Sequence, residues 1–243
     1  MSPSPQPTGP TLAPTDRLIV ALDAPDEAEA RALIAELRGT RVWFKIGMTL
    51  FYRTGRGLIS ELVAAGDHVF LDLKCHDIPH QVAGAVTALA DLGVELLTVH
   101  TSGGPAMLEA AARAVEGTAT KVLAVTVLTS LDRADLKATG VDRDPAELVL
   151  DRARLAAASG VHGVVASPLE ARALRQLLPA DFEIVTPGIR SASAPADDQR
   201  RTATPAQAIR AGATRLVVGR PITTACEPAM AARAMLREIE AAK

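Results

Sequence analysis

The chain has 243 residues, of which 48% are hydrophobic and 22% are charged, and its net charge is -2. This length allows one large domain with a full core, or two small domains. We do not expect nucleic acid as a partner. The chain has no run of Lys and Arg to neutralise phosphates. With 2% aromatic residues it also has few side chains on which unpaired bases could stack.

Residues 1–15 have the composition of a disordered tail, because five prolines lie among Ser, Thr, Gln and Gly with almost nothing apolar to bury. We expect one folded domain over residues 16–243. The tail has neither the basic start nor the apolar stretch of a secretory signal, and no segment approaches the ~20 apolar residues of a membrane span. We therefore expect a cytoplasmic protein with no membrane partner.

After the tail, short β-branched segments alternate eight times with longer segments of helical period. The expected strands are residues 17–22, 42–46, 68–73, 95–100, 121–127, 161–166, 183–186 and 214–218. Eight such units in a chain of about 250 residues predict a (β/α)8 TIM barrel. A doubly wound open sheet shares the alternation and stays possible, although the first expected strand is followed by Asp23-Ala24-Pro25-Asp26 and not by Gly-x-Gly-x-x-Gly.

The helices are expected to face the barrel through apolar stripes. Two examples are Ala28, Ala32, Leu33, Leu37 and Val82, Val86, Leu89, Leu92.

The segment 70–77, Phe-Leu-Asp-Leu-Lys-Cys-His-Asp, places three charged side chains around the end of an expected buried strand. Asp72 and Lys74 are two residues apart, so on a strand they point to the same face, and Asp77 follows at the turn. In a barrel this is the end at which active sites are built. The alternative is an ion-pair network that only holds a loop in place.

Most of the other expected strands also contain or precede polar residues, and these converge on the same mouth of the barrel. They are Asp23, Lys45, Thr129, Ser130, Arg190 and Arg220, with Gly219 before Arg220. Gly219, Arg220 and the start of the following helix are suited to a phosphate group, and Arg190 can close over it. Residues 191–201 are longer than a usual strand-helix connection and are a candidate lid, with an ordinary exposed loop as the alternative.

No metal site is expected. His76 and His80 have the spacing of a helical metal pair, but Pro79 between them makes a continuous helix doubtful. Cys75 and Cys226 are expected to be free thiols, since they belong to no paired-cysteine motif. His100 is expected to be a hydrogen-bonded core residue and not a base.

Seven sequence blocks follow one another along the chain: Ala21-Leu22-Asp23, Phe44-Lys45-Ile46-Gly47, Asp72-x-Lys74-x-x-Asp77-Ile78-Pro79, Val127-Leu128-Thr129-Ser130, Thr186-Pro187-Gly188-Ile189-Arg190, Asp198-Gln199-Arg200-Arg201 and Val218-Gly219-Arg220-Pro221. In this order they resemble the orotidine 5'-phosphate decarboxylase family, and the resemblance covers nearly everything from Leu18 to the C-terminus. The resemblance implies that residues 16–243 form a catalytic domain, a carboxy-lyase that makes uridine 5'-phosphate from orotidine 5'-phosphate in de novo pyrimidine synthesis.

The resemblance also assigns roles to residues. It implies that Asp72, Lys74 and Asp77 are catalytic, with Asp77 reaching into the neighbouring subunit of a homodimer. It assigns the ribose to Asp23 and Lys45, the pyrimidine edge to Thr129 and Ser130, and the phosphate to Arg190, Gln199, Gly219 and Arg220. One departure stands at His80-Gln81, where the family commonly has Asn-Thr, so Gln81 is not assigned to the site.

The expected chemistry is electrostatic and uses no cofactor. Loss of CO2 leaves a carbanion in the plane of the pyrimidine ring, and Lys74 is expected to stabilise this charge and then protonate it. Asp72, Lys74 and Asp77 together carry a charge of -1, so Asp72 is expected to face the substrate carboxylate.

Two other functions remain open at this point. One is a magnesium-dependent sugar-phosphate decarboxylase or aldolase on the same barrel, which would stabilise an enediolate through the metal. The other is a non-catalytic barrel that binds a nucleotide. The second is disfavoured, because a sensor needs the phosphate site but not the charged side chains at residues 72, 74 and 77.

Overall fold

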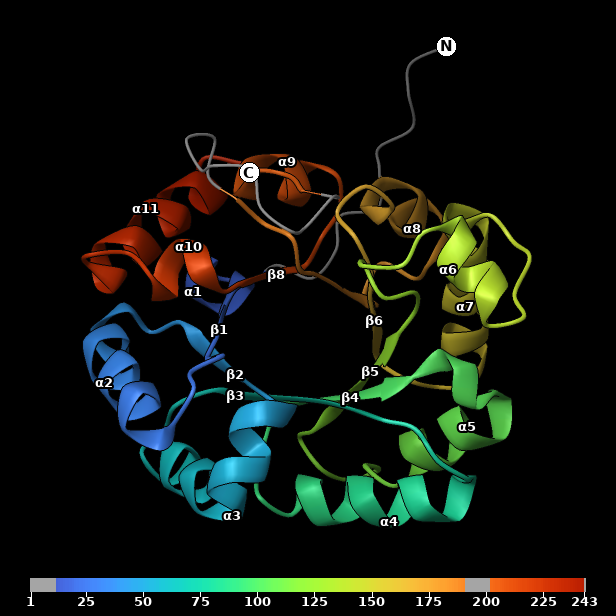
Figure 1. The fold of residues 1–243 in the computed structure, drawn as a ribbon, viewed down its shortest axis with the longest axis horizontal. Helices are drawn as coiled ribbons and strands as arrows, with labels where there is room; N and C mark the ends of the chain where they lie inside the picture. Colours follow the sequence, from blue (N-terminus) through green and yellow to red (C-terminus); the bar gives the residue numbers. More distant parts are fainter. Residues whose placement is uncertain (1–11, 191–201, 243) are drawn as a thin grey trace.

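The computed structural model describes residues 12–190 and 202–242, and its eight strands close into one barrel (Figure 1). Each strand pairs in parallel with the next along the chain, and the last pairs with the first. The strands are β1 (Leu18–Ala21), β2 (Trp43–Gly47), β3 (Val69–Cys75), β4 (Leu96–His100), β5 (Lys121–Val125), β6 (Gly163–Val165), β7 (Glu183–Thr186) and β8 (Arg215–Val218). The TIM-barrel prediction is confirmed, and the open-sheet alternative is wrong.

Helices surround the barrel on its outside (Figure 1). They are α1 (Pro14–Arg17), α2 (Glu27–Leu37), α3 (Met48–Ala64), α4 (Pro79–Ala90), α5 (Pro105–Arg113), α6 (Arg133–Ala138), α7 (Pro145–Ala158), α8 (Ala171–Leu177), α9 (Pro205–Arg210), α10 (Arg220–Thr223) and α11 (Pro228–Glu240), with the 3-10 turns η1 (Arg38–Thr40) and η2 (Thr101–Gly103). Pro79, Pro105 and Pro205 are the first residues of their helices, where the missing N–H costs nothing.

Apolar side chains form two layers, because successive residues of a strand point to opposite faces. Leu18 and Val20 of β1 face the helices and belong to the larger core cluster. Ile19 and Ala21 face the inside of the barrel, where they join a smaller cluster with Phe70 of β3 and residues of the other strands. The barrel is therefore filled with side chains and is not a pore.

Two expectations need correction. The tail was expected to extend to Thr15, but α1 begins at Pro14 and lies against α11 and β8. The buried stripe of α2 consists of Ala30, Leu33, Ile34 and Leu37, so the expected stripe was wrong at Ala28 and Ala32, which are exposed. The sequence offers alanines in both phases, and the four buried residues follow the i, i+3, i+4, i+7 spacing of one helix face.

The stripe of α4 is confirmed at Val82, Val86 and Leu89, which are buried, and Leu92 beyond the helix packs against the same core.

Within residues 12–190 and 202–242, no helix combines the length and the apolar character that crossing a membrane requires.

Candidate active site

A cavity of about 270 Å³ opens at the carboxyl ends of the strands. Its polar lining comes from six strands or the loops that follow them, and it consists of Asp23, Lys45, Asp72, Lys74, Thr129, Arg190 and Arg220. Sequence reasoning predicted all seven of these residues. The closed barrel brings them together, because parallel strands end at one rim.

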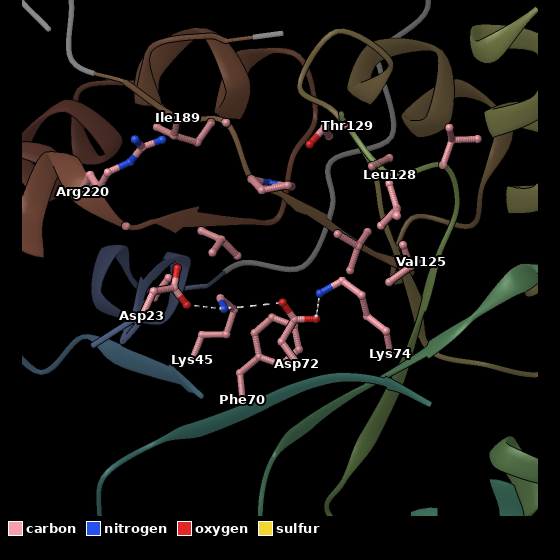
Figure 2. A pocket seen from close by; sticks show the side chains of 18 of the residues that line it. Asp23, Lys45, Phe70, Asp72, Lys74, Val125, Leu128, Thr129, Ile189 and Arg220 are labelled. Carbon is pink, nitrogen blue, oxygen red and sulfur yellow. Dashed lines mark hydrogen bonds and ion pairs between the residues drawn. The ribbon is translucent and has the colours of Figure 1, made fainter. Parts of the chain in front are cut away.

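Four charged side chains form a continuous row along one wall of the cavity (Figure 2). The ammonium nitrogen of Lys45 lies 3.4 Å from Oδ1 of Asp23 and 3.5 Å from Oδ2 of Asp72. The other carboxylate oxygen of Asp72, Oδ1, accepts a hydrogen bond of 2.8 Å from Nζ of Lys74. Within this chain the row holds two carboxylates and two ammonium groups, so its formal charges balance.

The backbone at Lys74 departs from a regular strand. Lys74 has a φ of 51°, in the left-handed region that residues with a side chain rarely adopt. The pairing of β3 with β4 also shifts here, since Leu71 pairs with Leu97 but Cys75 pairs with Val99. Asp72 and Lys74 do meet, as expected, but at an irregularity of the strand and not through simple alternation.

Thr98 of β4 contacts this row and was not predicted. Its hydroxyl group donates a hydrogen bond of 3.0 Å to Oδ1 of Asp72 and accepts one of 2.9 Å from the backbone N–H of Lys74. The signal was present in the sequence. Leu96 faces the barrel interior, so Thr98, two residues later, is a polar residue on that same face.

Asp72 stays ionised because of these partners. Burial by itself would raise the pKa of this carboxyl group, but the positive charges of Lys45 and Lys74 and the hydrogen bonds from Lys74 and Thr98 outweigh it. The net result is a pKa below the ordinary value for aspartate. The carboxylate therefore remains negative at neutral pH and keeps both lysines beside it.

The opposite side of the cavity is suited to an anion. Arg220 follows β8 and lies across the cavity from Asp72 and Lys74 (Figure 2), and Arg190 follows β7. Gly188 has a φ of 79°, which favours glycine. A Cβ atom at Gly219 would lie 3.7 Å from Cβ of Ala21 and 3.8 Å from Oδ2 of Asp23, so any longer side chain there would crowd this side of the cavity.

The space between these two polar regions has apolar walls. Val125, Val127 and Leu128 line it from β5 and the loop that follows, and Ile189 lines it beside the arginines. Phe70 and Val217 belong to the apolar cluster that fills the barrel interior. The arrangement fits a ligand that has an apolar part and an anionic end.

Two predicted residues do not line this cavity within one chain. Asp77 is exposed outside it, and its Oδ1 accepts a hydrogen bond of 2.6 Å from the backbone N–H of Ile78. Ser130 is exposed and does not line the cavity, although its neighbour Thr129 does. Gln199 and the expected lid lie outside the described residues.

The histidines near the mouth form a separate group. His100 accepts a hydrogen bond from the backbone of Ser102 and contacts that residue's Oγ at 2.5 Å, and its ring lies 5.6 Å from that of His76. Burial, together with the charges of Arg152, His76 and Lys74, lowers the pKa of His100 to about 4. His100 is therefore neutral at pH 7 and does not line the cavity.

His80 is exposed on α4, whose first residue is Pro79. In the part of the chain that the structure describes, no three His, Cys, Asp or Glu residues gather closely enough to hold a metal ion.

Known proteins resemble this chain over almost all of its length. The curated orotidine 5'-phosphate decarboxylase of Halorhodospira halophila is 54% identical over 229 residues, which are 93% of this chain and 97% of that protein. The enzyme of the same name from Moorella thermoacetica is 48% identical over 236 residues, 94% of each chain.

A solved structure is similar as well. The crystal structure of orotidine 5'-phosphate decarboxylase from Lactobacillus acidophilus has a TM-score of 0.83 and 39% sequence identity, and the match covers 92% of this chain and 99% of that one. The expected class of enzyme, a carboxy-lyase, is confirmed by these relatives. The family model described as "Orotidine 5'-phosphate decarboxylase / HUMPS family" matches residues 16–235. The chain therefore belongs to the orotidine 5'-phosphate decarboxylase / HUMPS family.

Proposed function

We propose that this chain converts orotidine 5'-phosphate to uridine 5'-phosphate and CO2, the decarboxylation step of de novo pyrimidine synthesis, without a cofactor. The observation that supports this most is the row Asp23, Lys45, Asp72 and Lys74 at one side of a cavity that has arginines at the other. The curated relatives named above share this activity in their names and do not favour the magnesium-dependent alternative.

Lys74 carries the chemical step in this proposal. When the bond from C6 of the pyrimidine to the carboxyl group breaks, the electron pair stays on C6, in an orbital that the ring cannot delocalise. An ammonium group held beside C6 stabilises this charge and then transfers a proton to the carbon. The 2.8 Å contact with Asp72 holds the Lys74 ammonium in the cavity, and its side chain is 29% exposed, so a ligand there can reach it.

The remaining residues divide the substrate among them. Asp23 and Lys45 bind the ribose, and Thr129 with Ser130 binds the polar edge of the pyrimidine. The phosphate is bound by Arg220, Arg190, the backbone at Gly219 and Gln199. The phosphate lies far from the bond that breaks. Its binding energy nevertheless holds the reacting carbon against Lys74, and this lowers the barrier. The substrate carboxylate then faces the negative charge of Asp72.

The active unit in this proposal is a homodimer in which Asp77 enters the partner's cavity. Asp77 is exposed and outside its own cavity. Large apolar side chains are exposed on the segments that follow β2 and β3: Met48 and Tyr52 at the start of α3 are 45% and 78% exposed, and Ile78, next to Asp77, is 63% exposed. These segments follow β2 and β3, which are adjacent in the barrel, so a partner at this rim would cover them.

Mixing two inactive variants tests the shared site. Asp77→Ala and Lys74→Ala should each be inactive alone. After mixing with subunit exchange, a hybrid dimer has one cavity with both wild-type residues, so activity should return to roughly a quarter of the wild-type value. Mixing that restores no activity, while native mass spectrometry shows by mass that hybrid dimers have formed, would rule out the shared role of Asp77.

A direct assay tests the reaction itself. The purified protein is mixed with orotidine 5'-phosphate and EDTA, and the ultraviolet change to uridine 5'-phosphate is followed together with CO2 release. We expect turnover that the chelator does not reduce. No turnover with or without Mg²⁺ would refute the proposed reaction, and turnover that needs Mg²⁺ would favour the metal-dependent alternative.

A further inference from the structure

Thr98 lies where β3 and β4 fall out of register. Leu71 pairs with Leu97, and the next pair is Cys75 with Val99. Residues 72–74 of β3 therefore face a single residue of β4, which is Thr98. A regular ladder cannot satisfy the backbone of that longer segment, because it has more amide groups than the facing strand has partners.

The Thr98 side chain takes the place of the missing ladder contact. Its Oγ1 accepts a hydrogen bond of 2.9 Å from the backbone N–H of Lys74, whose φ of 51° places that group outside the normal strand geometry. The same hydroxyl group donates a hydrogen bond of 3.0 Å to Oδ1 of Asp72. Oδ1 is also the oxygen that accepts the hydrogen bond from the Lys74 ammonium.

The Thr98 hydroxyl group is thus connected to Lys74 in two ways. It bonds the Lys74 backbone directly, and it is linked to the Lys74 ammonium through Asp72. Thr98 has no exposed surface, so water does not replace these bonds if the hydroxyl is lost. It does not line the cavity. Any effect it has on the reaction must therefore pass through Asp72 and Lys74.

We propose that Thr98 is a positioning residue for the decarboxylation, which keeps the Lys74 backbone in its left-handed conformation and the Asp72 carboxylate oriented toward the Lys74 ammonium. The inference rests on the proposed function, because it assigns Thr98 a part in that reaction. A hydroxyl group that acts as donor and acceptor at once is required, which threonine and serine supply and valine does not.

The test compares Thr98→Val with Thr98→Ser. Valine has nearly the same shape but leaves the Lys74 N–H without a partner and removes one donor from Asp72. We expect kcat to fall by about 10- to 100-fold in Thr98→Val, since small displacements of a catalytic group have effects of this size, with KM changed less than about threefold. Thr98→Ser should keep kcat within about threefold of the wild type.

The pH profile gives a second readout that mere loss of stability does not produce. The hydrogen bond from Thr98 helps to lower the pKa of Asp72. Without it that pKa rises, so the acidic limb of kcat should move to higher pH in Thr98→Val and not in Thr98→Ser.

Thr120→Val is the matched control. Thr120 is also buried, and its hydroxyl group donates a hydrogen bond of 2.6 Å to the backbone oxygen of Val94, away from the cavity. This variant should lower the melting temperature but leave kcat and its pH profile unchanged. If Thr98→Val does not fold, Thr98→Cys replaces it, because a thiol of similar size is only a weak donor and acceptor.

The outcomes separate this inference from the proposed function. If the wild-type protein does not act on orotidine 5'-phosphate, the proposed function fails. If the wild-type protein is active and folded Thr98→Val, or Thr98→Cys in its place, keeps kcat within about twofold, only the role of Thr98 is overturned. A loss of kcat that Thr98→Ser does not restore would overturn it too.

Discussion

The carboxylate of Asp72 interacts with the side chains of two lysines and one threonine. Lys45 approaches one of its carboxylate oxygens at 3.5 Å, while Lys74 and Thr98 contact the other at 2.8 and 3.0 Å. A buried carboxylate with this many partners has its orientation restricted, and it restricts theirs in turn. Contacts within the chain thus set the positions of both ammonium groups, which is the preorganisation that electrostatic catalysis needs.

Replacing Lys74 tests the assigned chemistry most directly. Lys74→Ala removes both the positive charge beside the carbanion and the proton donor, so we expect kcat to fall by at least about 10⁴-fold. Binding of uridine 5'-phosphate, measured by calorimetry, should persist because the phosphate site is intact. Lys137→Ala on the exposed surface of α6 is the control and should keep full activity. Near-normal turnover in Lys74→Ala would show that Lys74 is not the proton donor.

Arg220 should behave differently from Lys74. It lies across the cavity from the charged row, at the place proposed for the phosphate (Figure 2). Arg220→Ala should raise KM by roughly 10- to 100-fold, because a charge-assisted contact is lost, and kcat should fall much less than in Lys74→Ala. A substrate analogue that lacks the phosphate gives a second test of this role. The variant and the wild type should process this analogue equally slowly, because Arg220 then has no phosphate to bind. A variant that discriminates the two substrates as strongly as the wild type would remove Arg220 from the phosphate site.

At the scale of single elements, β3 does more than a regular strand would. Its first residues, Val69, Phe70 and Leu71, are buried and alternate between the outer and inner cores as β geometry requires. Its last residues carry the charges and lose register with β4. The regular part anchors the element, and the irregular part turns the Lys74 side chain toward the cavity.

Helix α7 begins at a side-chain cap. The side chain of Asp144 accepts hydrogen bonds from the backbone N–H groups of Ala146 and Glu147 at the start of α7. Asp144→Ala should lower the free energy of unfolding by about 1 kcal/mol, measured by denaturant titration, with kcat unchanged. Asp144→Asn keeps an oxygen acceptor and is the matched control. Equal losses in both variants would mean that the cap bonds do not stabilise the helix.

At the scale of the whole molecule, the two ends of the barrel have different tasks. The carboxyl ends of the strands carry the cavity, and the amino ends carry a second charged group that lines none of it. Glu183, the first residue of β7, is fully buried and contacts Arg215 at 3.4 Å, Lys121 at 3.1 Å and the hydroxyl group of Thr214 at 2.7 Å. The guanidinium of Arg215 lies 4.1 Å from the ring centre of Trp43, which closes the inner core from this side.

Removing Glu183 should therefore affect stability and not catalysis. Glu183→Ala leaves the buried Arg215 without its counter-charge, and we expect the free energy of unfolding to fall by about 3–5 kcal/mol. Lys121→Ala is the control: the Lys121 side chain is 44% exposed, so its loss should cost less than about 1 kcal/mol. The activity per folded molecule should be normal in both. A large loss of kcat in folded Glu183→Ala would contradict this division between the two ends.

The same group predicts how the protein responds to acid. Burial alone would raise the pKa of Glu183, but Arg215, Thr214 and Lys121 together lower it below the ordinary value of 4.5. A carboxyl group whose pKa is lower in the folded state stabilises the fold above pH 4.5, and this contribution is lost as the pH falls further. Unfolding free energies measured from pH 6 to 3 should thus decline less steeply below pH 4.5 in Glu183→Gln than in the wild type. Parallel curves would show that Glu183 does not contribute.

Sequence alone determined the features that depend on neighbours along the chain. The eightfold alternation predicts the closed barrel, and the polar residues at strand ends, from Asp23 to Arg220, predict which side chains meet at its mouth. These predictions succeed because residue period, chain length and the parallel arrangement leave few other ways to bury the apolar faces. The resemblance assigns Asp77 to a partner subunit's site. Its side chain is exposed and lies outside the cavity of its own chain, and its role in a partner's cavity stays a prediction.

Only the tertiary structure decided the contacts between distant segments. Thr98 and Asp72 are 26 residues apart, and Glu183 and Arg215 are 32 apart. Whether such side chains touch depends on the register between strands, and a shift of the kind seen between β3 and β4 has no local sequence signal. The left-handed backbone at Lys74 has the same origin: a lysine does not favour this conformation by itself, and the contacts made by β4 hold it there.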